Sequence, residues 1–177
     1  MELLTEDPEH FFQRLVTGDE TWVYHRDPES KMESMQWKHK TSPTPKKFRV
    51  EKPAGKVMTT VFWDEKGLLL LESMPQKTTI TANTITALRA AIKEKRRGKL
   101  SADVLLLHDN APVHMSAKSQ AAIQQCGFQQ LNHPPYSPDL APSDYFLFRV
   151  MKKFLWGKRF SSNEEVKEQS KDFFPGG

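Results

Sequence analysis

The run Val104-Leu105-Leu106-Leu107 is the feature of this 177-residue chain that most constrains its fold. Four consecutive apolar residues bounded by polar ones predict a strand that is buried on both faces, and such a strand needs helices on both sides of its sheet. Helical patterns at about 82–97 and 114–126 flank the run, and each is followed by a glycine that can end it. The sequence therefore predicts an α/β domain with this strand inside the sheet.

The residues before this run predict the other strands of the sheet. A strand is expected from 15 to 24, where Gly18-Asp19 would interrupt it as a bulge or kink. Alternating apolar residues around a glycine-containing turn predict a hairpin at 56–63 and 68–72. The aromatic residues of the hairpin, Phe62 and Trp63, are expected to pack in the core.

The length of the chain suits one domain, and residues 1–14 predict a helical lead-in that docks one apolar face on its core. No apolar stretch approaches the roughly 20 residues that cross a bilayer. The first residues lack the pattern of a secretory signal, so we expect a soluble intracellular protein with no membrane partner. A single cysteine, Cys126, permits no internal disulfide, so the core must be held by packing alone.

Two clusters of basic residues indicate contact with a polyanion. The first lies in a polar, proline-broken segment at about 25–53, which predicts a long loop, and long loops inside compact domains tend to be functional. The loop residues expected to contact DNA phosphates are Lys38, Lys40, Lys46, Lys47, Arg49 and Lys52. The second cluster, at 89–99, closes a predicted helix. Its cations suit the negative end of the helix dipole, a nucleic-acid surface or a nuclear localisation signal.

Three aspartates lie where an apolar pattern gives way to a turn or a helix start. Asp19 lies in the first strand, Asp109 ends the 104–107 run, and Asp144 follows Ser143, which can cap the next helix. At about 100° per residue, Asp144 would lie in line with the apolar stripe of that helix, so its carboxylate would face the sheet. The aromatic residues of this helix, at 146–154, are also expected to pack in the core.

These residue types suit cleavage of a phosphodiester by two divalent cations, which needs acidic ligands that hold the ions roughly 3.5–4 Å apart. Mg²⁺ fits because it binds few carboxylates and keeps several waters. The three acids could meet at one edge of the sheet if the first and fourth strands are neighbours. Each acid alone is equally consistent with turn chemistry or a helix dipole. For His108 and His114, which flank the second acid, a structural or surface role is favoured over a ligand or substrate contact.

Three motifs, in this order, resemble the acid-bearing motifs of the mariner-type DNA transposases. They are Val-Thr-Gly-Asp-Glu-Thr-Trp at 16–22, His-Asp-Asn-Ala-Pro-Val-His at 108–114 and His-Pro-Pro-Tyr-Ser-Pro-Asp-Leu-Ala-Pro-Ser-Asp-Tyr at 133–145. The thirty-four residues between Asp109 and Asp144 match the spacing in that family, and the similarity extends from about Leu3 to Val166. Motifs of this length are far more specific than any single acid.

The resemblance implies a ribonuclease H-like catalytic domain at 15–166, in which a mixed sheet is flanked by helices. It implies that Asp19, Asp109 and Asp144 are catalytic and bind two Mg²⁺ ions per site, for which Mn²⁺ substitutes. In the implied reaction, water cleaves at a transposon end and the freed 3′ hydroxyl attacks target DNA. The implied partners are DNA, with His114 as a further candidate contact, and the second subunit of a homodimer. A clamp-like loop at about 25–53 would reach that subunit, and the expected location is the nucleus.

The chain also departs from the family pattern. Family members begin with two helix-turn-helix units that precede the matched segment, so we expect this chain alone to lack sequence-specific DNA binding and transposition. Residues 167–177 predict a truncated tail, with the C-terminal helices shortened. A nonenzymatic DNA-binding or dimerisation module that retains the fold is therefore an alternative function. A phosphoryl-accepting aspartate at a strand end would explain Asp109 but would leave the other two acids without a role.

Overall fold

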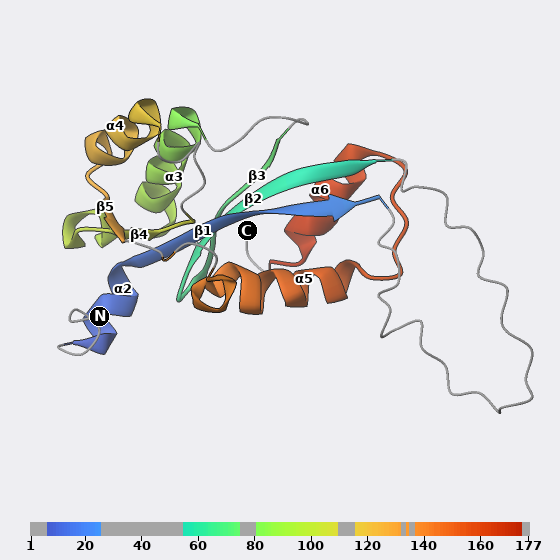
Figure 1. Cartoon of the computed structure of the whole chain (residues 1–177), viewed down its shortest axis with the longest axis horizontal. Helices are drawn as coiled ribbons and strands as arrows, with labels where there is room; N and C mark the ends of the chain where they lie inside the picture. Colours follow the sequence, from blue (N-terminus) through green and yellow to red (C-terminus); the bar gives the residue numbers. More distant parts are fainter. Residues whose placement is uncertain are drawn as a thin grey trace, which may run out of the picture.

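The computed structural model describes residues 7–25, 55–74, 81–109, 116–131, 134 and 137–174. Its centre is a five-stranded sheet with the strand order β3-β2-β1-β4-β5 (Figure 1). The strands are β1 (Leu15–Tyr24), β2 (Lys56–Asp64), β3 (Gly67–Met74), β4 (Leu105–Leu107) and β5 (Gln129–Leu131). β2 pairs antiparallel with both β1 and β3, whereas β4 and β5 run parallel to β1. This is the predicted mixed sheet.

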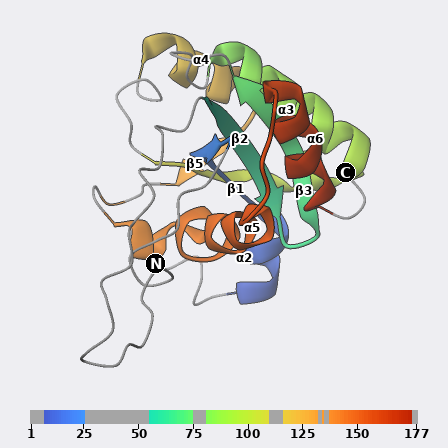
Figure 2. The same ribbon diagram turned by 90° about the vertical axis from the view of Figure 1, so that its right-hand side faces the viewer.

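Helices cover both faces of the sheet, as predicted. The longer helices are α3 (Ala82–Lys95), α4 (Ala117–Gln125), α5 (Phe148–Leu155) and α6 (Asn163–Asp172). Figures 1 and 2 show α3 and α4 on one side of the strands and α5 on the other. Shorter helical segments are the 3-10 helices Lys99–Ala102 and Pro138–Leu140 and the π-helical turn Ser143–Leu147. Within the described ranges, no helix is long and apolar enough to cross a membrane.

Two apolar cores lie on the two faces of the sheet. Val16 of β1 belongs to the core under α3 and α4, together with Phe62, Leu88 and Leu106. Val23 of β1 belongs to the other core, under α5 and α6. Because successive side chains of a strand point to opposite faces, Asp19 shares the face of Val23 and therefore points to the side of α5.

Within the described residues, the chain before the sheet forms α2 (Pro8–Arg14); residues 1–6 of the predicted helical lead-in lie outside them. The expected apolar docking is wrong, because α2 buries none of its residues and Phe12 is 47% exposed. A hydrogen bond attaches the helix instead, as the Arg14 Nε donates to the carbonyl oxygen of Asp103 over 2.9 Å.

The predicted bulge at Gly18-Asp19 is wrong as well. β1 pairs with β2 without a register shift, from Thr17 opposite Trp63 to Tyr24 opposite Lys56. A Cβ atom at position 18 would overlap the ring of Phe62, so glycine permits close packing there. The register shift lies one strand further, between β2 and β3, where Phe62 faces Leu70 but Trp63 faces Leu68.

A buried ion cluster fixes the end of β2, and it uses part of the second basic cluster. The side chain of Asp64 is fully buried and lies 3.0 Å from both Arg96 Nε and Lys99 Nζ. Lys99 Nζ also donates to the carbonyl oxygen of Leu15, at the start of β1, over 3.1 Å. Burial alone would raise the pKa of Asp64, but the hydrogen bonds and charges of Arg96 and Lys99 outweigh it and lower this pKa. These two cations therefore hold the sheet together.

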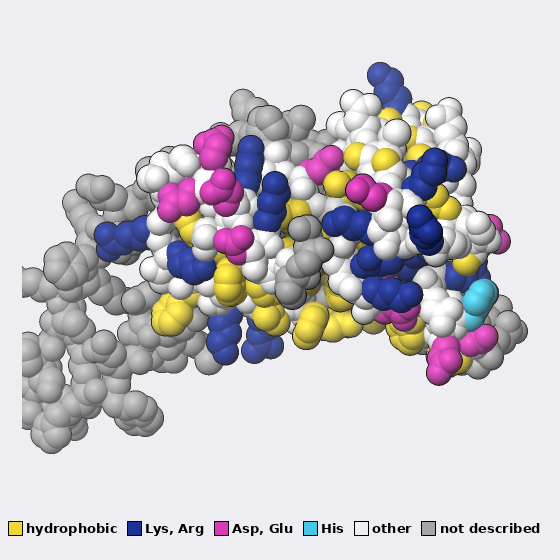
Figure 3. Space-filling model, turned by 180° about the vertical axis from the view of Figure 1, so that it is seen from behind, with side chains coloured by type: hydrophobic (Ala, Val, Ile, Leu, Met, Phe, Trp, Pro, Cys, Tyr) yellow, Lys and Arg dark blue, Asp and Glu magenta, His cyan; other side chains and the backbone are white. Residues whose placement is uncertain are grey.

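The helix after the third motif exposes much of its aromatic stripe, contrary to the prediction of core packing. Phe146 and Phe154 are 55% and 40% exposed, and Val150 and Trp156 are exposed beside them. Hydrophobic side chains gather along the lower edge of the molecule in Figure 3, where α5 lies. Phe148 is the aromatic residue of this helix that the core does bury.

The carboxyl end of β1 and the start of β2 are held at one point by His25. Its backbone N–H donates to Gly55 O over 3.0 Å, and its carbonyl accepts from the Phe160 N–H over 2.9 Å. The His25 ring also donates to Asn163 Oδ1 at the start of α6, over 2.8 Å. Apart from His25, the predicted clamp-like loop lies outside the described residues. Helix α6 runs through residue 167, the expected start of the truncated tail, and buries Ser170.

Candidate active site

The register of two parallel strands brings the first two acids to one edge of the sheet. β1 and β4 are neighbours, with Val16 beside Leu106 and Thr17 beside Leu107. This confirms the condition on which a shared site depends. Asp19 and Asp109 each lie two residues beyond the Thr17–Leu107 pair, so Asp19, inside β1, is near the level at which Asp109 follows the end of β4.

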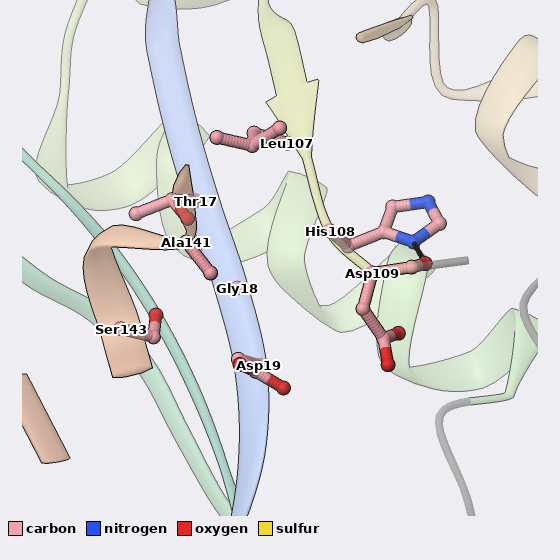
Figure 4. A pocket seen from close by; sticks show the side chains of 8 residues that line it. All are labelled: Thr17, Gly18, Asp19, Leu107, His108, Asp109, Ala141 and Ser143. Atoms are coloured by element: carbon pink, nitrogen blue, oxygen red, sulfur yellow. Dashed lines mark hydrogen bonds between the residues drawn. The ribbon is translucent and has the colours of Figure 1, made fainter. Parts of the chain in front are cut away.

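A small pocket lies at this edge, between β1, the end of β4 and the segment that leads into the π-helical turn. Its lining residues are Thr17, Gly18, Asp19, Leu107, His108, Asp109, Ala141 and Ser143 (Figure 4). In Figure 4 the side chains of Asp19 and Asp109 extend to the same side of this edge, and Ser143 lies across β1 from Asp109. Residues from all three motifs therefore line one pocket.

Asp144 comes to this edge from the π-helical turn, and it is more exposed than predicted. The carboxylate was expected to face the sheet, yet Asp144 is exposed, and its neighbour Ser143, at 1% exposure, points inward. The reason is the π-helical turn, in which the Phe148 N–H bonds to Ser143 O. A π turn takes one residue more than an α turn, so the 100° phase inferred from α5 does not extend back to Asp144.

The negative charges of the other two acids act on Asp19. Burial, followed by the negative charge of Asp144, raises the pKa of Asp19 from 3.8 to about 7, and Asp109 and Glu20 add to the rise. The Glu20 N–H, which donates to Asp19 Oδ1 over 2.7 Å, opposes it. The charges of Asp109 and Asp144 thus both act at Asp19.

The three acids are not arranged around one position at which a metal ion could bind. Within the part of the chain that the structure describes, no group of three or more His, Cys, Asp or Glu side chains is placed to hold a metal ion. Asp19 and Asp109 line the pocket, whereas Asp144 lies beside it. The acidic residues at this edge of the sheet therefore have the charges that a cation site needs, but they are not arranged around a single ion position.

His108 is buried, and its Nδ1–H donates to the carbonyl oxygen of Asp109 over 2.7 Å. This contact braces the chain directly beside the second acid. His114 and the expected phosphate contacts, Lys38, Lys40, Lys46, Lys47, Arg49 and Lys52, lie outside the described residues.

Ser143 has a role that the sequence did not indicate. It was expected to be the N-cap of the next helix, but Pro142 takes that position and Ser143 is the first residue of the π-helical turn. It accepts a hydrogen bond from Trp63 Nε1 of β2 over 3.1 Å. The two residues are 80 positions apart, so no local spacing in the sequence could have revealed this contact.

Comparison with known proteins supports the sequence motifs. Residues 27–102 match the family model described as Transposase (partial DDE domain). The chain is 34% identical, over 170 residues, to the mariner Mos1 transposase of Drosophila mauritiana, and the match covers 93% of this chain and 48% of that protein. The chain therefore spans about half the length of this curated relative.

Solved structures agree in both sequence and fold. The catalytic domain of Mos1 mariner transposase is 30% identical, with a TM-score of 0.75, and the match covers 99% of this chain and 77% of that one. Two Mos1 paired-end complexes, one with Mn and one with Mg, are each 32% identical, with TM-scores of 0.83 and 0.82. Those matches cover 99% and 98% of this chain and 52% of each of the other chains. The chain thus belongs to the mariner transposase family, and its fold is the ribonuclease H-like fold of that family's catalytic domain.

Proposed function

We propose that this chain cleaves DNA phosphodiesters and transfers DNA strands as the catalytic domain of a mariner-type transposase. The observation that carries the proposal is the parallel β1–β4 register, since it sets Asp19 beside Asp109 at the pocket that Ser143 also lines. The charge of Asp144 at Asp19 supports a shared role for the three acids. The likeness to a solved mariner catalytic domain supports the class of reaction.

The donor set fits a hard divalent cation. Carboxylate oxygens are the ligands that Mg²⁺ and Mn²⁺ prefer. Burial and two neighbouring negative charges make ionised Asp19 unfavourable without a compensating cation. We assign Asp19, Asp109 and Asp144 as the ligands of two such ions, which would activate the attacking oxygen and stabilise the leaving one. The three aspartates would hold the two ions at the sheet edge. Buried His108 braces the backbone of Asp109 through its hydrogen bond to the Asp109 carbonyl oxygen.

We further propose DNA and a second copy of the chain as the partners, and the nucleus as the location. The basic composition of residues 25–53 supports phosphate contact through Lys38, Lys40, Lys46, Lys47, Arg49 and Lys52. The Mos1 paired-end complexes support DNA as a partner, and we propose that the second copy joins through the clamp-like loop at about 25–53.

The test is metal binding and cleavage by the purified chain. We expect Mn²⁺ to bind in calorimetry and to support nicking of plasmid DNA and joining of pre-cut transposon ends. Asp144→Asn should weaken Mn²⁺ binding because it removes one charged ligand. Asp139→Asn is the matched control, since Asp139 is an exposed aspartate five residues away on the 3-10 helix Pro138–Leu140. A folded, metal-loaded chain that neither nicks nor joins DNA would refute the proposal.

One observation favours a second candidate, a nonenzymatic DNA-binding or dimerisation module. Among the described residues, the acids are not gathered around a common point. Such a module would bind DNA with a steep salt dependence, because each phosphate contact releases a counterion. It would show no turnover with Mn²⁺ at any concentration, which separates it from the enzyme.

A further inference from the structure

We propose that Trp63 and Ser143 are positioning residues for Asp144. Their hydrogen bond would fix the π-helical turn Ser143–Leu147 against the sheet, and so set the direction in which Asp144 meets the pocket. The inference rests on the proposed function in one respect, namely that Asp144 is a metal ligand. Neither residue is expected to touch the metal or the DNA.

The contact joins the sheet to the residue directly before the acid. Trp63 Nε1 donates to Ser143 Oγ over 3.1 Å. Ser143 is 1% exposed and lines the pocket together with Asp19 and Asp109. An indole N–H is only a donor, so this bond uses the whole hydrogen-bonding capacity of the Trp63 side chain.

Regular alternation along β2 points Trp63 towards the turn, because Phe62 packs with the core under α3 and its neighbour Trp63 faces the other side. Between Phe62 and Trp63 the register with β3 shifts, so that Leu69 becomes an extra residue on β3. Leu69 and Leu70 both pack with the core under α3, whereas Trp63 packs with the core under α5. The bulge thus displaces Leu69 of β3 and leaves the direction of Trp63 to β2 itself.

Pairing with β1 fixes Trp63 relative to the first acid. Trp63 lies opposite Thr17, which lines the pocket and is two residues before Asp19 on the same face of β1. Trp63 therefore connects the strand that carries Asp19 with the turn that carries Asp144.

Two hydrogen bonds hold Ser143, one at its backbone and one at its side chain. Its carbonyl oxygen accepts from the Phe148 N–H, which closes the π turn, while its hydroxyl accepts from Trp63. π-helical turns are rare and are frequent at functional sites. Without the hydroxyl contact, Ser143 would lose one of these two hydrogen bonds, and a change from the π turn to an α turn would rotate Asp144 relative to α5.

Apolar packing alone does not account for this bond. Leu147, Phe148, Met151 and Leu155 dock the helix on the sheet, and none of them needs the N–H of Trp63. The ring of Trp63 also lies against Phe146, with a 6.3 Å centroid distance. A phenylalanine at position 63 keeps an aromatic ring there, so removal of the donor should disturb the turn and leave α5 docked.

The first arm of the test needs no metal. Amide hydrogen exchange is measured at Phe148, which closes the π turn, and at Met151 inside α5. Trp63→Phe and Ser143→Ala should each speed exchange at Phe148 about tenfold, the factor that corresponds to roughly one net hydrogen bond. The double variant should be no faster than either single one, because both remove the same bond.

Trp22→Phe is the matched control, since Trp22 lies on the neighbouring strand and on the opposite face from Asp19. It should leave exchange at Phe148 unchanged, and no variant should change exchange at Met151. Wild-type exchange at Phe148 in Trp63→Phe, or faster exchange at Met151 as well, would overturn the proposal.

The second arm measures the consequence for Asp144. Trp63→Phe should weaken Mn²⁺ binding several-fold in calorimetry, and saturating Mn²⁺ should restore the cleavage rate. Unchanged Mn²⁺ affinity despite faster exchange at Phe148 would mean that the bond holds the turn but not the acid, and would overturn the positioning role. A wild-type chain that binds no Mn²⁺ would refute the proposed function, and the exchange arm would still decide whether the bond sets the turn.

Discussion

Asp19 and Asp109 are placed by paired strands, whereas Asp144 is placed by an irregular turn. On the strand side, the pairing of Thr17 with Leu107 determines where any residue two positions further must lie. On the helix side, a 3-10 helix runs into a π-helical turn whose direction depends on the contacts of Ser143. Regular pairing thus places a side chain by position alone, and an irregular turn places it through individual hydrogen bonds.

The strand side should tolerate no change of its acids. Asp109→Asn keeps the shape of the side chain and removes its charge. DNA cleavage should fall on the order of a thousandfold, because several kcal/mol of charge stabilisation is lost at about 1.4 kcal/mol per tenfold in rate. Single-turnover nicking in Mn²⁺ measures the rate, with Asp139→Asn as the control. Cleavage at the wild-type rate by Asp109→Asn would remove the strand side from the site.

The alignment of β1 with β2 should depend on the buried ion cluster. Asp64→Asn leaves Arg96 and Lys99 without their charge partner, and both are largely buried, so the free energy of unfolding should fall by about 3–5 kcal/mol in urea titrations. A loss below about 1 kcal/mol would mean that the cluster does not hold the strands.

The pH dependence of this cluster has a definite sign. Because the pKa of Asp64 is lowered in the folded state, its contribution is complete above its usual value of 3.8. It is lost as the pH falls from there through the folded-state pKa. In Asp64→Asn this part of the acid dependence should be absent.

Gly18 offers a smaller change on the strand side. Gly18→Ala pushes a methyl group into the Phe62 ring, and overpacking of this kind costs about 1–3 kcal/mol of stability. Phe62→Leu in the same chain should recover part of the loss, since it makes room for the new methyl group. Chemical denaturation of the two single variants and the double variant measures the coupling. Strictly additive losses would contradict the packing role assigned to this glycine.

The smallest effect is expected on the outer face of α5. Val150 is 42% exposed, so Val150→Ala should change the free energy of unfolding by no more than about 0.5 kcal/mol. Its neighbour Met151 is fully buried, and Met151→Ala should cost about 2–5 kcal/mol. Thermal and urea unfolding of this pair measures the contrast. Equal losses would show that the outer face of α5 is covered in solution.

The same contrast explains what the sequence could predict. The apolar run before Asp109, the hairpin pattern and the helical periods follow from local spacing, and the structure has the corresponding strands and helices. A shared site for Asp19 and Asp109 required the first and fourth strands to be neighbours. The pairing of β1 with β4 confirms that condition. The roles of these acids as metal ligands stay a prediction.

The failures lie where distant contacts decide local geometry. Gly18 signalled a bulge, but the partner that requires glycine there is Phe62 on another strand. Ser143 was predicted to cap a helix, but its hydroxyl accepts a hydrogen bond from Trp63. The exposure of Asp144 was not predicted, because a π turn takes one residue more than an α turn and the helical phase of α5 does not extend through it.

His25 marks the point where the chain between β1 and β2 begins. The chain leaves the sheet at His25 and returns at Gly55, and a backbone hydrogen bond of 3.0 Å joins the two. The chain thus leaves and rejoins the sheet at one hydrogen-bonded pair, and a change in the length between these two residues should cost little, because loop-closure free energy grows only slowly with length. The pairing of β1 with β2, and with it the position of Asp19, should therefore not depend on that length.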